Sequence, residues 1–141
     1  MKKQIKSLLP LTGLILFHFL FCGFLTFTEA GKAFLVFVLI TVWFWLVIHA
    51  GLFYLCGRWS QRQYPRKTPG QICISVTGGT LYALIFPFFI GLESFARWGH
   101  WSAPAVRPTL EGALFILVPF LMAFVPCLLG QVLECKKSVS Q

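Results

Sequence analysis

Residues 112–133, GALFILVPFLMAFVPCLLGQVL, contain no Asp, Glu, Lys or Arg. A helix needs about 20 apolar residues to cross roughly 30 Å of hydrocarbon, so this run predicts a membrane-spanning helix. Backbone groups in lipid must bond within their own segment, which favours helices over strands. Three further runs without a formal charge lie upstream, at residues 8–28, 33–56 and 72–92. The sequence therefore predicts an all-α membrane protein with four transmembrane helices in one compact bundle.

The composition excludes an ordinary soluble domain. Hydrophobic residues make up 57% of the chain and charged residues only 11%. So few charges cannot form the polar shell that a folded soluble domain of this size needs. The net charge of +8 would suit a nucleic-acid-binding protein. The basic residues flank the apolar runs, however, as they do in membrane proteins, so we expect the lipid bilayer as a partner and no nucleic acid.

Lysine and arginine are unevenly divided between the two sides of the predicted bundle. The side that is richer in Lys and Arg is normally cytoplasmic. This rule predicts that both termini and a basic loop at 57–71 are inside, and that segment 93–111 is outside. The length, the lysine-rich start and the asymmetry are typical of a multi-pass protein of the bacterial inner membrane. The outside set is Lys32, Arg97 and Arg107, and the inside set is Lys2, Lys3, Lys6, Arg58, Arg62, Arg66, Lys67, Lys136 and Lys137.

Local signals predict where the helices begin and end. Gly31 and Gly57 suit left-handed C-caps of the first two helices. Thr68 is a candidate N-cap of the third helix, with Gln71 as the second half of a capping box. Thr109 is the expected cap of the fourth helix.

The N-terminal region leaves one processing alternative open. Basic residues, an apolar run and the sequence TEA at residues 28–30 resemble a cleavable signal peptide. The run is longer than the roughly 7–15 apolar residues of such a peptide. Cleavage would leave three spans and an outside N-terminus.

Small and weakly polar residues at four-residue spacing mark the predicted packing faces, because such residues let membrane helices approach closely. The third helix has the clearest face, with Ser75, Gly79 and Ala83. The other helices carry looser stripes, which we expect to face the same interior: His18, Cys22 and Thr26; Thr41, Trp45 and His49; Pro119, Ala123, Cys127 and Gln131.

His18 and His49 are the ionisable groups predicted to lie deepest in the membrane, with Cys127 level with His49. Polar groups at such depth are candidates for function. We weigh three interpretations: neutral imidazoles bonded across helix interfaces, a proton relay or ligand-gating group, and haem ligation by both histidines. The chain has no haem-attachment motif, and a His/Cys pair without further ligands is a weak metal pattern. We therefore expect neither a cofactor nor a metal.

Segment 93–101 is the most distinctive stretch outside the predicted spans. Phe95, Trp98 and Trp101 recur every three residues, and Arg97 is spaced for an ion pair with Glu93. An aromatic anchor at the membrane interface is one interpretation. The other is a docking rim for a periplasmic partner or an incoming toxin helix, because Trp and Arg dominate interface hot spots.

The sequence lacks the parts of an enzyme. It contains no Asp, and its four Glu are scattered at positions 29, 93, 111 and 134. We hypothesise a bundle that acts by protein–protein contact, as an accessory subunit or as an immunity or exclusion protein, with another membrane protein or a second copy as partner. The alternatives are a small oligomeric transporter or channel and, third, a haem-binding electron-transfer subunit.

Overall fold

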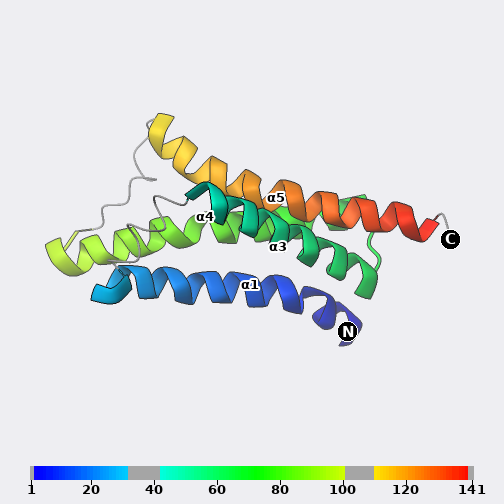
Figure 1. Ribbon diagram of the computed structural model, residues 1–141, viewed down its shortest axis with the longest axis horizontal. Helices are drawn as coiled ribbons and strands as arrows, with labels where there is room; N and C mark the ends of the chain where they lie inside the picture. Colours follow the sequence, from blue (N-terminus) through cyan, green and yellow to red (C-terminus); the bar gives the residue numbers. More distant parts are fainter. Residues whose placement is uncertain (1, 32–41, 101–109, 140–141) are drawn as a thin grey trace.

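Four long helices lie side by side in the computed structural model, which describes residues 2–31, 42–100 and 110–139 (Figure 1). Within these ranges no strand is present. The predicted all-helical chain is therefore confirmed for the described residues. The helices, in chain order, are α1 (Lys2–Phe27), α3 (Val42–Gln63), α4 (Thr68–Trp98) and α5 (Leu110–Val139).

Three stretches of the described helices are long and apolar enough to cross a membrane. They are Gln4–Phe27, Thr68–Trp98 and Gly112–Lys136. Most of the large side chains on their outer surfaces are apolar and exposed, as in α1 at Leu9 and Leu20. Such continuous apolar surface suits lipid rather than water. Part of the second predicted span, residues 33–41, lies outside the described residues.

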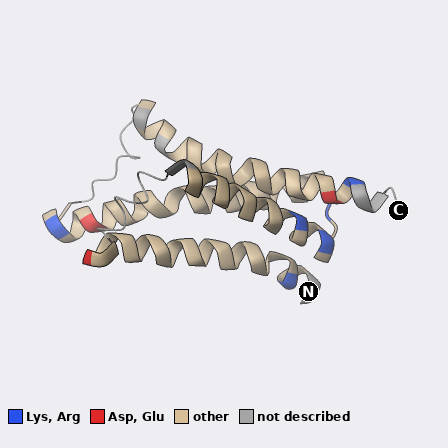
Figure 2. Ribbon diagram, in the orientation of Figure 1, with Lys and Arg blue, Asp and Glu red and all other residues tan. Residues whose placement is uncertain are grey.

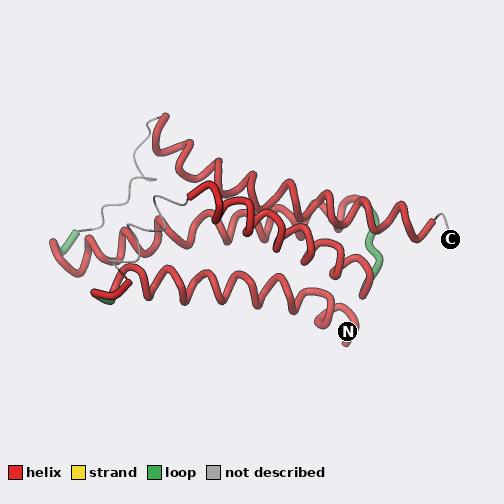
Figure 3. The backbone as a smooth tube through the Cα atoms, viewed as in Figure 1, coloured by secondary structure: helices red, strands yellow, loops and turns green. Residues whose placement is uncertain are grey.

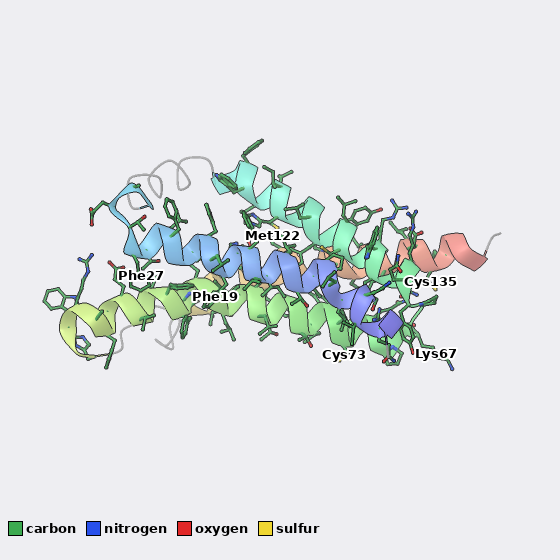
Figure 4. The ribbon with its side chains drawn as sticks, turned by 90° about the horizontal axis from the view of Figure 1, so that it is seen from below. Phe19, Phe27, Lys67, Cys73, Met122 and Cys135 are labelled. Carbon is green, nitrogen blue, oxygen red and sulfur yellow. The ribbon has the colours of Figure 1, made fainter. Side chains whose placement is uncertain are left out.

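The start of α1, the connection at residues 64–67 and the end of α5 all lie at one end of the described helices (Figures 1 and 3). Figure 2 shows that the described Lys and Arg residues gather at the ends, with none in the middle. Figure 4 places Lys67 and Cys135 at this end and Phe27 at the opposite one. This end, termed the basic end, carries Lys6, Arg58, Arg62, Arg66, Lys67 and Lys136.

All four helices contribute to one apolar core. Leu11 of α1, Phe53 of α3, Tyr82 of α4, and Ala123 and Cys127 of α5 form a buried cluster. α5 packs most extensively on α3 and next on α4, while α1 packs against α3 and α4.

Gly57 is not a C-cap, contrary to the sequence prediction. α3 continues past it to Gln63, so the predicted loop at 57–71 shrinks to residues 64–67. A Cβ on Gly57 would overlap the carbonyl oxygen of Cys127 in α5, and a Cβ on Gly130 would overlap the carbonyl oxygen of Tyr54 in α3. These two glycines therefore serve a close backbone crossing between α3 and α5.

Gly31 is not a left-handed cap either. α1 ends at Phe27, and Gly99 is the one residue with a positive φ in the described ranges. The Thr28 hydroxyl donates to the Phe24 carbonyl at 2.9 Å and accepts the Gly31 N–H at 2.9 Å. Thr28 thus closes α1 and acts as the N-cap of the helical turn at 29–31.

α4 begins one residue earlier than the capping box predicts. Thr68 is its first helical residue, so the N-cap is Lys67, which makes no side-chain capping bond. The Gln71 amide donates to the Arg66 carbonyl at 2.9 Å instead of closing a capping box. The expected cap of the last helix, Thr109, lies outside the described residues.

Candidate functional site

The small residues of α4 lie on its buried side. Ser75 and Ala83 are almost fully buried, and Gly79 lies under the Phe120 ring of α5, which a Cβ would approach to 3.1 Å. Gly78, next to Gly79, accommodates Leu11 of α1 in the same way. α4 therefore uses adjacent glycines to receive one helix on each side.

His18 of α1 and His49 of α3 lie in contact inside the bundle. Their ring centroids are 5.1 Å apart in an edge-to-face arrangement. The Tyr82 ring of α4 packs on both, with its centroid 4.4 Å from that of His18 and 5.6 Å from that of His49. The structure thus brings together the two predicted histidines and adds a tyrosine that sequence analysis missed.

The two imidazoles differ in their hydrogen bonds. His49 Nδ1 lies 2.7 Å from the Trp45 carbonyl, which only accepts, so this nitrogen carries the proton. His18 Nε2 lies 3.5 Å from Cys22 Sγ, and His18 Nδ1 is buried with no hydrogen-bond partner among the described residues. His18 therefore retains unused hydrogen-bonding capacity between the helices.

This geometry does not favour the haem interpretation. A porphyrin needs to lie between two axial imidazoles, whereas these rings touch each other and Tyr82. In the part of the chain that the structure describes, no group of three or more His, Cys, Asp or Glu side chains is arranged to hold a metal ion.

Cys127 does not join the histidines. It lies with Ser75 and Gln131, whose amide donates to Ser75 Oγ at 3.0 Å and to the Gln71 carbonyl at 3.3 Å. The Gln131 amide nitrogen is 3.7 Å from Cys127 Sγ. This buried group binds α5 to α4 near the basic end.

An apolar layer lies between this polar group and the histidine pair. Phe53 is fully buried and packs against Tyr82 with ring centroids 5.0 Å apart. Leu11 and Ala123 belong to the same apolar cluster. The two polar regions of the interior are therefore separated by packed hydrocarbon.

Arg66, in the connection between α3 and α4, forms a clasp at the basic end. Its guanidinium donates to the hydroxyl of Ser7 in α1 and to the hydroxyl of Ser60 in α3, the latter at 2.9 Å. Both serines are buried. Burial lowers the pKa of Arg66 and the nearby Tyr64 opposes this, but an arginine starts so high that it stays protonated at neutral pH. The arginine clasp, defined as Arg66 with Ser7 and Ser60, therefore holds α1 to α3 by charge-assisted hydrogen bonds.

The backbone of Arg66 is held as well. The Gln61 side chain accepts the Arg66 N–H at 3.2 Å and donates to the Arg66 carbonyl at 3.1 Å. Gln71 donates to the same carbonyl. The connection is thus fixed in position from both adjoining helices.

The far end of α4 carries an exposed aromatic rim, defined as Phe95, Arg97 and Trp98. Trp98 is 72% exposed and Phe95 is 56% exposed. Arg97 pairs with Glu93 at 2.6 Å, which confirms the predicted i, i+4 ion pair. Gly99 ends the helix with φ 68° and donates its N–H to the Phe95 carbonyl at 2.9 Å. The rim is therefore the last, glycine-capped turn of α4. Trp101, its fourth predicted member, lies outside the described residues.

Sequence analysis missed the arginine clasp, the Gly57–Gly130 crossing and the role of Tyr82. Gln131, the most polar side chain in its span, was a usable signal for an interhelical bond. Ser7 and Arg66 gave no such signal, because their contact depends on how α1 lies against the connection.

The chain matches no protein-family model, and comparison with curated proteins and with solved structures finds no significant similarity.

Proposed function

We propose that this protein crosses the bacterial inner membrane four times, with both termini in the cytoplasm, and acts by contact with another membrane protein. The three apolar helices support the membrane location. α3 packs along α5 and α1. The sequence from residue 33 to residue 56 contains no Asp, Glu, Lys or Arg, which supports a fourth crossing. The gathering of Lys and Arg at the end that holds both termini supports a cytoplasmic position for that end (Figure 2).

The aromatic rim carries the proposal of a contact function. Trp98 and Phe95 are large, apolar and exposed, and their helical turn is fixed by an ion pair and a glycine cap. The end of α4 that carries them reaches beyond the end of α1 (Figure 1). A hollow of about 210 Å³ beside the rim is lined by Ile90, Glu93, Ser94, Arg97 and Trp98. Trp and Arg are the residue types enriched among interface hot spots, and an adjacent hollow offers space for a partner side chain.

Photo-crosslinking tests this proposal. A photoreactive phenylalanine analogue at position 95 is expected to give a discrete crosslinked product in intact cells. Adding Trp98→Ala should abolish that product, because a central Trp at an interface contributes about 2 kcal/mol or more, roughly thirtyfold in affinity. The measurement is the yield of the product on a denaturing gel.

The matched control is Trp59→Ala, which removes an exposed Trp at the basic end. This variant should leave the product unchanged. A product that survives Trp98→Ala, or that Trp59→Ala removes equally, argues against docking at the rim.

A second candidate, a small oligomeric transporter or channel, is favoured by the histidine pair. Two imidazoles and a tyrosine in contact between the helices are groups that can accept and donate protons. We prefer the contact function because Phe53 and Leu11 fill the layer between this pair and the polar group at the basic end.

A further inference from the structure

Arg58 and Arg62 lie one turn apart on α3 and share one carboxylate, Glu134 of α5. Arg58 Nε donates to Glu134 Oε2 at 2.8 Å, and Arg62 Nε donates to Glu134 Oε1. Without the carboxylate, two guanidiniums at this spacing would repel each other. Glu134 therefore holds them as a fixed pair, termed the arginine pair.

The arginine pair keeps an excess of one positive charge, because one carboxylate neutralises only one of its two guanidiniums. The side chain of Glu134 is 10% exposed, whereas those of Arg58 and Arg62 are 33% and 54% exposed. Each ion pair uses the Nε atom, and the Arg58 guanidinium also lies over the Tyr54 ring, 5.9 Å from its centroid. The exposed surface of the triad is consequently cationic.

The outer face of α3 continues from this pair along an apolar stripe. The Leu55 side chain is 57% exposed and that of Trp59 is 50% exposed. Their spacing places them on the same side of the helix as Arg62. Glu134 and Arg62 lie at the boundary between the apolar helices and the basic end. A ligand that fits this surface has an anionic group attached to a long apolar chain.

We propose that the arginine pair binds the phosphate of an anionic phospholipid, whose acyl chain lies along Leu55 and Trp59. Guanidinium groups bind phosphate oxygens with paired, charge-assisted hydrogen bonds. Basic pockets between transmembrane helices at the cytoplasmic surface are suited to anionic headgroups. A free phosphate would use the arginines but gain nothing from the apolar stripe, which is why we assign the site to a lipid. The site does not depend on the docking function of the aromatic rim.

Native mass spectrometry of the detergent-purified protein tests the proposal. Phosphatidylglycerol, which is anionic, should bind more tightly than zwitterionic phosphatidylcholine. The double variant Arg58→Gln with Arg62→Gln should bind phosphatidylglycerol with an affinity at least about tenfold lower, since each cation near the lipid surface adds to the affinity. The Lys/Lys double variant, which keeps the charge but loses the forked donors, should be intermediate.

Lys6→Gln is the control, because Lys6 is an exposed cation at the same basic end but does not belong to the arginine pair. It should bind phosphatidylglycerol as the unaltered protein does. Unchanged binding in the Gln/Gln variant overturns the proposal, and so does equal competition by inorganic phosphate, which would indicate a soluble anion. If the Gln/Gln variant does not fold, Arg62→Gln alone decides, since Arg58 then still pairs with Glu134: weaker binding supports the site and unchanged binding overturns it.

Discussion

Gly57→Ala is expected to destabilise the protein by about 2 kcal/mol or more, although alanine is intrinsically the better helix former by roughly 1 kcal/mol. The added methyl group would overlap the carbonyl oxygen of Cys127 and lie 3.0 Å from its carbonyl carbon. These are backbone atoms of α5, so no side-chain rotation relieves the clash and the two helices must separate. The measurement is the free energy of unfolding in mixed micelles, obtained by titration with a denaturing detergent.

Gly51→Ala is the control on the same helix. A Cβ on Gly51 meets no atom within 4 Å, so this variant should be neutral or slightly more stable. Gly130→Ala should resemble Gly57→Ala, because its methyl group would overlap the Tyr54 carbonyl. Equal stability of the Gly57 and Gly51 variants would contradict the close crossing of α3 and α5.

Arg66→Ala is the second substitution with a large expected effect, a loss of about 2–3 kcal/mol in unfolding free energy. It removes the charge-assisted bonds to Ser7 and Ser60 and leaves the buried Ser60 hydroxyl without its donor. The backbone bonds of Arg66 to Gln61 and Gln71 do not involve its side chain and should persist. We therefore expect the loss to be concentrated in α1, seen as faster amide hydrogen exchange near Ser7.

Lys67→Ala provides the comparison, since Lys67 is the adjacent cation and its side chain is exposed. It should change the unfolding free energy by less than about 0.5 kcal/mol. Arg66→Lys should also be destabilising, because an ammonium cannot reach both serines with the geometry of a forked guanidinium. Similar losses of unfolding free energy for Arg66→Ala and Lys67→Ala would show that Arg66 contributes through general surface charge and not through the arginine clasp.

The sequence was sufficient to predict helices, because that outcome depends on local properties. Charge-free runs of about 20 residues dictate helix in lipid whatever their neighbours are. The i, i+4 pair of Glu93 and Arg97 is confirmed for the same reason, since one helix supplies both partners.

Helix ends were predicted less well, because tertiary contacts determine them here. The predicted span ends at Cys56, but α3 continues to Gln63. In this last part Ser60 and Gln61 bond to Arg66, while Arg58 and Arg62 bond to Glu134. A glycine at the end of an apolar run therefore resembled a cap, whereas its position opposite Cys127 made it a packing site.

The sequence predicts which residues face the interior, but it does not predict which of them contact each other, because those contacts depend on the relative positions of the helices. The stripes place His18, His49 and Cys127 on inward faces, but they do not specify which residues meet across the bundle. The structure brings the two histidine rings into contact, with Tyr82 packed against both, and places Cys127 with Gln131. That distinction depends on how the helices cross and on the register between them.

The proposed topology depends most on whether α3 crosses the membrane. Topology reporters fused after Gly31, Tyr64, His100 and the C-terminus test it in living cells. Four crossings with cytoplasmic termini predict that Gly31 and His100 are outside, and that Tyr64 and the C-terminus are inside. Reporters at Gly31 and Tyr64 on the same side of the membrane would contradict a crossing by α3, and with it the proposed topology.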